Sequence, residues 1–246
     1  MTGVPGFAPK WPAPANVRAW VTERGSAARY GALNLALHVG DDADAVVANR
    51  SRLRAALALR SEPRWLEQVH GTRVLDLDRE HEPPAAADGA VTAVPGNVCA
   101  VLTADCLPVL FCSVDGRRVG AAHAGWRGLL NGVLRSAVGA LQSDPKDLVA
   151  WLGPAIGQAA YEVGADVRDA FVARDAAADL RFAPNARGRW QADLYGLARD
   201  ALAAAGVRSV HGGGFCTYTE AERFYSHRRE APCGRMATLV WLDAPP

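Results

Sequence analysis

The chain has 246 residues, of which 50% are hydrophobic, and its 27 basic and 26 acidic side chains leave a formal net charge of +1. A chain of this size can bury a large core, so we expect one compact domain over 1–246, with an irregular lead-in at 1–15. Because basic and acidic residues are interspersed, nucleic acid is not an expected partner. The most apolar window, 98–114, is interrupted by Asp105 and Pro108, so no membrane span is expected.

Cysteine usage indicates a reducing compartment. The five cysteines cannot all pair within one chain, no C-x-x-C occurs, and the first residues lack the apolar stretch of a signal peptide. We therefore expect a cytoplasmic protein with free thiols. Cys99 and Cys112 lie in apolar runs and are expected to be small core residues.

The first half of the chain predicts one long helix among short strands. A loop is expected at 24–40, after which Asp41 and Asp42 offer an N-cap to a segment whose apolar residues recur at helical spacing. An acidic, Pro-rich surface loop is expected at 79–87. The expected elements are a helix at 43–59 and strands at 16–22, 65–69, 72–77, 89–93, 98–103, 109–114 and 118–122.

The second half predicts helices and strands in irregular alternation. The expected elements are helices at 129–141, 165–174 and 193–205, and strands at 148–152, 207–211 and 236–241. Strict strand–helix alternation is missing, and hairpin-like neighbours lie in the middle of the chain. We therefore expect mixed sheets rather than one parallel sheet, and the predicted fold class is α+β.

Three residues with metal-binding side chains lie where predicted strands end. They are His70, Cys106 and His123, and each is followed by a turn marked by glycine or proline. Imidazole and thiolate bind zinc well, and three protein ligands leave the open position typical of a catalytic site. A thiolate beside an imidazole also fits a Cys-His nucleophile pair, and spacing alone does not separate the two, although the second histidine favours metal.

A charged residue, Asp105, interrupts the apolar run that contains Cys106. An acid in such a run needs a chemical use or hydrogen bonds, so it is either a catalytic group or a cap on backbone amides of the turn. A helix beginning just after Gly125 could hold an anion such as phosphate near His123. The chain has no HExxH, Walker, GxSxG or zinc-deaminase signature, so those enzyme classes are not expected.

Longer motifs run through the chain in order. They are ALNL and HVGD, then EQVHG, TADCLPV, AAHAGWRG, GPAIG with YEVG, FYSHRRE and GRMA. With these motifs the chain resembles the YfiH-like laccase-domain family of purine nucleoside phosphorylases, once called multicopper polyphenol oxidases, over about 17–241.

The resemblance implies a layered α/β sandwich of mixed sheets flanked by helices, with His70, Cys106 and His123 as metal ligands. It implies phosphorolysis of adenosine, inosine, guanosine and methylthioadenosine, with an accompanying adenosine deaminase activity. Zinc is the expected cofactor, and the same ligands can take copper in vitro. The expected partners are a purine nucleoside and phosphate. The sequence predicts no oligomeric state and is compatible with a monomer.

Candidate catalytic and substrate-binding residues lie in the matching motifs. Asp105 is the candidate proton-transfer group beside Cys106, and Arg228 is the candidate catalytic cation. Asn34 is a candidate for lining the pocket, but it is as well suited to stabilising a turn. The full set of candidate substrate-binding residues is Arg24, Asn34, His38 and Arg229.

The chain departs from the usual family pattern at three positions. His227 stands where an aromatic residue is common, Glu230 where Asp is common, and Cys233 where Thr is more usual. We expect His227 to pack like an aromatic side chain, with a fourth nitrogen near the metal as the alternative. The three departures bear on substrate preference and not on metal binding.

Three other functions remain open at this point. A thiol hydrolase or amidase acting on a peptidoglycan precursor would use Cys106 as nucleophile and His123 as base. Zinc with a fourth protein ligand, such as Cys216 or His227, would be structural and would favour a binding protein. The third is a copper-dependent polyphenol oxidase, which copper acquired in vitro could imitate.

Overall fold

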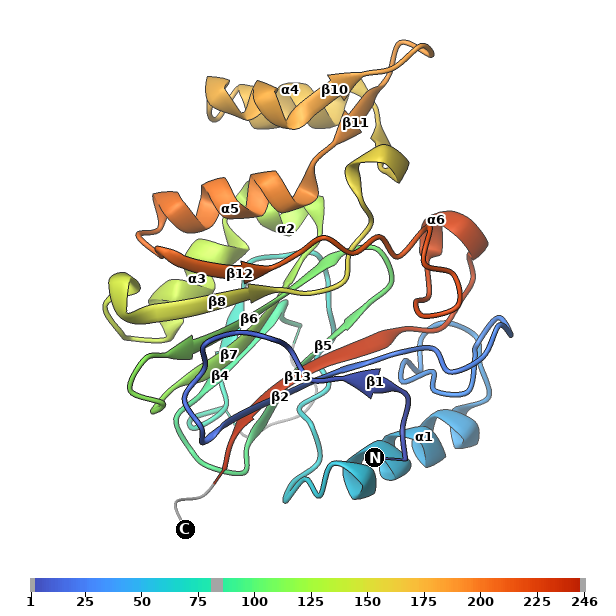
Figure 1. Ribbon diagram of the computed structural model, residues 1–246, viewed down its shortest axis with the longest axis vertical. Coiled ribbons are helices and arrows are strands. Elements are labelled where there is room, and N and C mark those ends of the chain that lie inside the picture. Colours follow the sequence, from blue (N-terminus) through green and yellow to red (C-terminus); the bar gives the residue numbers. More distant parts are fainter. Residues whose placement is uncertain (1–2, 81–85, 244–246) are drawn as a thin grey trace.

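The computed structural model describes residues 3–80 and 86–243 (Figure 1). Its strands form a six-stranded, a four-stranded and a three-stranded sheet, with helices beside them. This arrangement confirms the predicted α+β class with mixed sheets flanked by helices. Within the two described ranges, no helix has the length and apolar character needed to cross a bilayer.

The six-stranded sheet runs through the centre of the molecule in the order β12-β8-β6-β7-β4-β3. The outer pairs β12–β8 and β3–β4 are parallel, and the inner pairs are antiparallel. Its strands are β3 Val74–Asp76, β4 Gly89–Thr92, β6 Leu107–Ser113, β7 Val119–Ala124, β8 Leu148–Leu152 and β12 Ser209–Gly212.

The four-stranded sheet is antiparallel, in the order β1-β2-β13-β5. Its strands are β1 Gly6–Phe7, β2 Val17–Thr22, β5 Val98–Thr103 and β13 Met236–Leu242. The prediction of an irregular segment at 1–15 is wrong at β1. Phe7 pairs with Val21 of β2, and its ring packs against Trp151 and Phe215, with centroids 6.4 and 5.6 Å away, so this segment is held in place.

These two sheets stack face to face, and alternate side chains of each strand point to opposite faces. In β6, Leu110 and Cys112 join the core between the sheets, whereas Val109 and Phe111 face the helices. Cys99 lies in the same inter-sheet core, which confirms that it and Cys112 are core residues.

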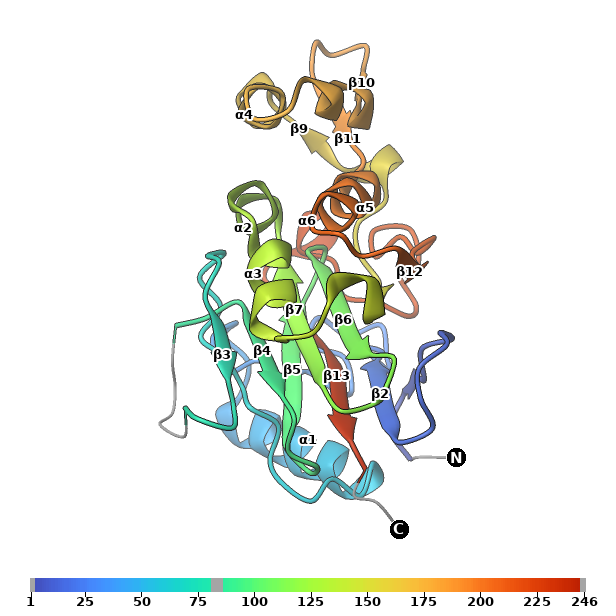
Figure 2. The ribbon, with the colours of Figure 1, turned by 90° about the vertical axis from the view of Figure 1, so that its left-hand side faces the viewer.

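Helices cover the outer face of each sheet, so the body has four layers (Figure 2). Helix α1 packs on the four-stranded sheet, and α2, α3 and α5 pack on the six-stranded sheet. The predicted N-cap is Asp42, whose Oδ1 accepts a 2.8 Å hydrogen bond from the Ala45 amide. The helices are α1 Ala43–Ala56, α2 Trp126–Asn131, α3 Val133–Ala140, α4 Ala165–Val172, α5 Leu194–Ala204 and α6 His227–Glu230.

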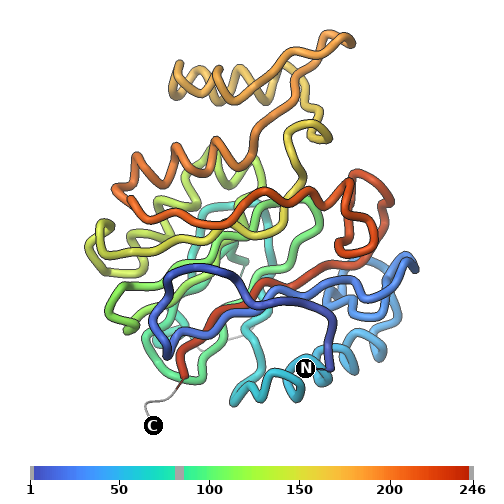
Figure 3. Tube along the Cα trace, in the orientation of Figure 1, coloured from blue at the N-terminus to red at the C-terminus, as the bar shows by residue number. Residues whose placement is uncertain are grey.

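A small subdomain projects beyond α5 at one end of the molecule (Figure 3). It contains α4 and the three-stranded sheet, whose order is β10-β11-β9. Its strands are β9 Glu162–Val163, β10 Phe182–Pro184 and β11 Trp190–Ala192, and none of them is predicted from the sequence. Single turns of 3-10 helix lie at Pro145–Asp147 and Gln158–Ala160, and a longer one at Ala176–Arg181.

Two predicted elements are wrong. The segment 65–69 is not a strand, because the side chain of Gln68, not the backbone, pairs with β5: it accepts from the Leu102 amide at 2.7 Å and donates to the Leu102 carbonyl at 2.8 Å. The helix predicted at 129–141 is divided by Gly132, whose φ of 96° ends α2. The other predicted elements are present with ends shifted by a few residues, and the predicted loop at 79–87 lies partly outside the described residues.

Candidate metal centre and pocket

The three side chains expected as metal ligands lie together at one end of the six-stranded sheet. The ligand atoms of His70, Cys106 and His123 are all within 4.8 Å of one another. Nε2 of His70 lies 3.8 Å from Sγ of Cys106, and the two imidazole rings meet edge to face with centroids 4.8 Å apart. The distant sequence positions thus form one cluster of two nitrogen donors and one sulfur donor.

Strand register explains this convergence. Cys106 directly precedes β6, and β6 pairs with β7 so that Pro108 lies opposite His123. Adjacent strand ends therefore bring the thiol and the imidazole to the same edge. The third group, His70, has a φ of 59°, a left-handed conformation that non-glycine residues rarely adopt. Asp105 is also left-handed, with a φ of 86°, and such strain concentrates at functional sites.

Gly125 gives the cluster the room it needs. A Cβ atom at this position would lie 2.8 Å from Cδ2 of His70 and 3.0 Å from Sγ of Cys106. Any side chain there would push these two groups apart. The glycine of the AHAGW motif thus allows the backbone to approach the three donor atoms closely.

Asp88 is buried behind the cluster and holds two of its members. Its Oδ1 accepts a 2.8 Å hydrogen bond from Nδ1 of His123 and a 2.9 Å bond from the His70 amide. Its Oδ2 accepts from the Gly71 amide at 2.6 Å and the Val69 amide at 3.2 Å. With Nδ1 of His123 bound to the carboxylate, Nε2 is the nitrogen left for a metal, an arrangement common behind histidine ligands.

The negative charge of Cys106 and the positive charge of His123 stabilise each other. Burial disfavours the thiolate of Cys106, but the charge of His123 and hydrogen bonds from both histidines outweigh it and lower the Cys106 pKa to about 6. Burial also disfavours the His123 imidazolium, but the thiolate and Asp88 raise its pKa to about 9. The thiolate is the form that binds a metal, so this donor set fits zinc.

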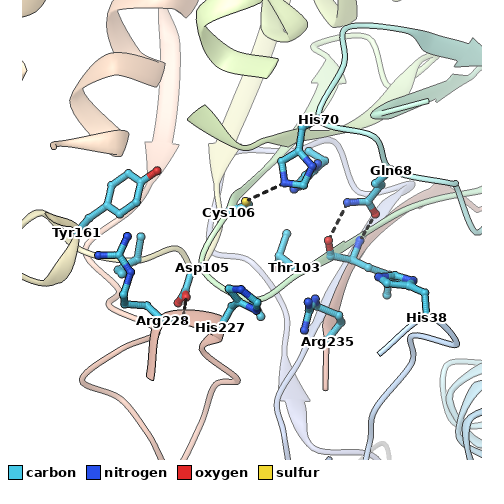
Figure 4. A pocket seen from close by; sticks show the side chains of 14 residues that line it. His38, Gln68, His70, Thr103, Asp105, Cys106, Tyr161, His227, Arg228 and Arg235 are labelled. Atoms are coloured by element: carbon cyan, nitrogen blue, oxygen red, sulfur yellow. Dashed lines mark hydrogen bonds between the residues drawn. The ribbon is translucent and has the colours of Figure 1, made fainter. Parts of the chain in front are cut away.

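A pocket of about 290 Å³ opens beside the cluster (Figure 4). In Figure 4, Tyr161 and Arg228 lie at one side of it, and His38 and Arg235 lie at the other. The lining residues are His38, Gln68, His70, Leu102, Thr103, Ala104, Asp105, Cys106, His123, Ile156, Tyr161, His227, Arg228 and Arg235. The volume is near the lower end of the range for small-molecule sites.

Asp105 lines this pocket, as expected, but its carboxylate is also a structural anchor. Oδ1 accepts a 2.6 Å hydrogen bond from the Thr217 hydroxyl, and Oδ2 accepts a 2.7 Å bond from the Arg228 amide. The carboxylate thus links the segment that contains Cys106 to the start of α6. Both readings of Asp105 from the sequence, as a catalytic group and as a cap on backbone amides, are compatible with this position.

The Arg228 side chain also lies in the pocket wall. Its Nη1 donates a 2.9 Å hydrogen bond to the Glu162 carbonyl, and its guanidinium carbon is 5.5 Å from the centroid of the Tyr161 ring. These contacts connect the projecting subdomain to the site. Since Arg228 is exposed and forms no ion pair with another described residue, its charge remains available to a ligand.

Three other candidates lie outside the pocket lining. Arg24 is 2% exposed, and its guanidinium is bound to Glu230 at 2.8 Å and to backbone carbonyls. Arg229 donates to the carbonyls of Thr217, Tyr218 and Phe224. The guanidinium groups of both arginines therefore stabilise the structure around α6.

Asn34 is likewise fully buried and outside the lining. Its side chain accepts from the amides of Ala36 and Arg235 and donates to Asp41. This is the turn-stabilising role considered for it from the sequence. His38, from the same loop, does line the pocket.

The positions that depart from the family pattern have separate surroundings. His227 is exposed at the pocket and is not one of the three clustered metal-binding groups. Cys216 accepts a 3.3 Å hydrogen bond from the Gly157 amide and is not in that cluster either. In the described part of the chain the cluster therefore has no fourth protein ligand. Glu230 pairs with Arg24, and Cys233 is buried.

Sequence reasoning missed four residues of the site. Asp88 and Gln68 support the cluster and the pocket wall, while Tyr161 and Arg235 line the pocket. Asp88 gives a usable signal, since an acid directly before the apolar strand β4 needs buried partners. Gln68, Tyr161 and Arg235 lie in the motifs EQVHG, YEVG and GRMA, but nothing in these motifs shows that their side chains reach the pocket.

A four-layer α+β fold with a His-Cys-His cluster at its strand ends defines a protein with a site suited to a metal ion. Residues 18–243 match the family model described as multi-copper polyphenol oxidoreductase laccase. The crystal structure of a Neisseria meningitidis protein of this fold superposes with a TM-score of 0.93 at 44% identity, covering 97% of this chain and 99% of that one. The structure of YlmD from Geobacillus stearothermophilus gives 0.87 at 32% identity, covering 98% and 99%.

Curated relatives are also similar over nearly their whole length. The Escherichia coli protein named purine nucleoside phosphorylase YfiH is 51% identical over 237 residues, covering 95% of this chain and 97% of that protein. A Pseudomonas aeruginosa protein, also named purine nucleoside phosphorylase, is 53% identical over 239 residues, covering 96% and 97%. The chain therefore belongs to the YfiH family of laccase-like proteins, as its motifs predict.

Proposed function

We propose that this protein is a zinc-dependent purine nucleoside phosphorylase of the cytoplasm, acting as a single domain. The observation that carries the proposal is a cluster of two imidazoles and one thiol that opens directly onto a pocket with two arginines. The names of the relatives support the reaction class. The proposed substrates are adenosine, inosine, guanosine and methylthioadenosine, with adenosine deamination as an accompanying activity.

In the proposed reaction, an oxygen of inorganic phosphate forms a bond to C1′ of the ribose while the bond from C1′ to N9 of the purine breaks. The electron pair of that bond goes to the purine, which takes up a proton, and the products are the free base and ribose 1-phosphate. A zinc ion held by His70, Cys106 and His123 would act as a Lewis acid toward a substrate oxygen.

The chain itself would supply the remaining functions. Asp88 keeps the His123 ring oriented through Nδ1. Arg228, beside Tyr161, would contact the nucleoside and offset negative charge that develops in the transition state. Asp105 is the proposed proton-transfer group, because it lines the pocket next to Cys106.

The test is a product analysis with and without phosphate on metal-analysed protein. We expect zinc-loaded protein to convert adenosine to adenine and ribose 1-phosphate only when phosphate is present. Conversion to inosine in the same sample would support the deaminase activity. If no purine nucleoside is cleaved by the zinc-loaded protein in the presence of phosphate, the proposed function is wrong.

One observation favours a second function, a thiol hydrolase. Cys106, His123 and Asp88 form a chain of thiolate, imidazole and carboxylate that resembles a nucleophile, a base and an orienting group. A chelator separates the two functions. The phosphorylase should lose activity on metal removal and regain it with zinc, whereas a thiol enzyme should survive the chelator and be inactivated by alkylation.

A further inference from the structure

The side of the pocket away from Arg228 contains a second cationic group that motif reasoning did not identify. Arg235 and His38 lie there together (Figure 4). Arg235 directly precedes β13, whereas His38 comes from the loop before α1. Partial burial, followed by the positive charges of Arg235 and Arg50, lowers the pKa of His38 and so favours the neutral imidazole.

The Arg235 residue is held in position by the surrounding backbone. Its Nη1 donates to the carbonyls of Cys233 at 2.7 Å and Gly234 at 3.1 Å, and its amide donates to Oδ1 of Asn34 at 3.0 Å. Asn34 is itself fully buried. The guanidinium is therefore preorganised, so that little side-chain entropy is lost when it binds a ligand.

No acidic side chain neutralises this arginine within the described part of the chain. Its side-chain contacts there all use Nη1, and Nε and Nη2 have no hydrogen-bond partner. Arg24 and Arg168, in contrast, pair with carboxylates, those of Glu230 and Asp179. Asp105, an acidic residue of the pocket lining, is already bound to Thr217 and to the Arg228 amide.

We propose that Arg235 and His38 form a subsite for a phosphoryl oxyanion, which in the proposed reaction is the inorganic phosphate. The planar fork of an arginine suits two oxygens of such an anion, and a neutral imidazole can donate one further hydrogen bond. The identity of the anion as cosubstrate rests on the proposed function, whereas the existence of the subsite does not. Arg228 and Tyr161, at the other side of the pocket, then remain for the nucleoside.

The first test is kinetic and uses Arg235→Gln with Arg199→Gln as its matched control. Arg199 also donates to two backbone carbonyls, those of Val210 and Gly212, but it lies in a separate groove. We expect R235Q to raise KM for phosphate at least 10-fold and to change KM for the nucleoside less than 2-fold. R199Q should leave both values unchanged. An unchanged KM for phosphate in R235Q, or an equal rise in R199Q, would overturn the proposal.

The second test does not depend on nucleoside cleavage. Inorganic phosphate alone should raise the thermal midpoint of the wild-type protein, and this shift should be lost in R235Q and reduced in R235K and His38→Asn. Because the His38 side chain is itself exposed, H38N tests the subsite even if R235Q does not fold. Equal phosphate-induced shifts in wild type and variants would overturn the subsite, whatever the outcome for phosphorolysis.

A third arm distinguishes free phosphate from phosphate carried by a nucleotide. Adenosine 5′-monophosphate is titrated as an inhibitor of wild type and R235Q. If R235Q weakens inhibition by the nucleotide but keeps the wild-type KM for phosphate, the assignment to inorganic phosphate is wrong. If the affinity for inorganic phosphate falls, that assignment stands.

Discussion

The two walls of the pocket are built in different ways. The metal wall comes from the paired ends of β6 and β7, with Asp88 buried behind it. The rest of the pocket carries the cations, with Arg228 of α6 at one side and His38 and Arg235 at the other, and these three side chains are exposed or half-buried. The contrast indicates that buried groups at the strand ends fix the donor atoms, while exposed or half-buried side chains outside the sheet present charge to the substrate. Substitutions in the first wall should abolish the chemistry, and those in the second should change substrate binding.

The largest effect is expected for His70→Ala. Loss of one of three ligands should remove the zinc and lower turnover more than 10³-fold, since the open-site metal would be the source of Lewis acidity. Metal analysis and the phosphorolysis assay measure the two results. The matched control is His211→Ala in β12, away from the cluster. Wild-type turnover by H70A would show that the site is assigned wrongly.

Asp88→Ala should weaken zinc binding indirectly, through the two histidine ligands that Asp88 holds. Without the carboxylate, Nδ1 of His123 and the amides of His70 and Gly71 lose their acceptor. Loss of such a supporting residue typically weakens metal binding by about 10–100-fold. Zinc competition against a chromophoric chelator measures this, and an unchanged affinity in folded D88A would contradict the role of Asp88.

Asp105→Asn separates proton transfer from positioning. The amide oxygen can still accept from the Arg228 amide, and the amide nitrogen can donate to the Thr217 hydroxyl, so the local structure should persist. We expect kcat to fall by about 10², the lower range for loss of general acid–base catalysis, with zinc content unchanged. Wild-type kcat in D105N would leave Asp105 with a positioning role alone.

Arg228→Gln should have a smaller effect, which concerns the nucleoside and leaves zinc binding unchanged. Since Arg228 is exposed and forms no ion pair with a described residue, the fold should tolerate the change. KM for the nucleoside should rise about 10-fold, a loss of roughly 1.4 kcal/mol in binding, and kcat should also fall because the transition state loses a cation, while KM for phosphate stays within 2-fold. The opposite pattern would exchange the roles of Arg228 and Arg235.

Arg24→Gln should have the smallest effect on catalysis. This buried guanidinium pairs with Glu230, and its loss should lower the free energy of unfolding by about 3 kcal/mol, because a partly buried carboxylate and several carbonyls lose their donor. Kinetic constants of the folded fraction should stay within 2-fold of wild type. Chemical denaturation measures the first quantity. A 10-fold rise in KM for phosphate would instead return Arg24 to the substrate site.

Much of the fold follows from local patterns, and the failures have physical causes. The strands β4, β5 and β7 are apolar runs bounded by turn residues, so their positions can be predicted from the sequence. The segment 65–69 has the composition of a strand, but a side-chain pairing by Gln68 replaces the backbone ladder. A pairing between residues so far apart in the sequence leaves no pattern in the local sequence. The same is true of β9 and β11, which are too short to show alternation.

The residues of the site likewise divide into those that the sequence predicts and those that it does not. His70, Cys106 and His123 could be predicted because each is a metal-binding side chain at the end of a predicted strand, and the family motifs then grouped them. The arginines could not be sorted by sequence, since nothing local to Arg24, Arg228 or Arg229 shows which of them other parts of the chain bind. Only the tertiary contacts show that Arg24 and Arg229 are bound to the protein, whereas Arg228 faces the pocket.

X-ray absorption at the zinc edge of the untagged, metal-replete protein tests the central claim most directly. We expect one zinc per chain with a single sulfur neighbour at about 2.3 Å and nitrogen or oxygen neighbours at about 2.0–2.1 Å. In C106A the sulfur neighbour should disappear. Two or more sulfur neighbours, or a wild-type spectrum in C106A, would contradict a cluster of two imidazoles and one thiolate.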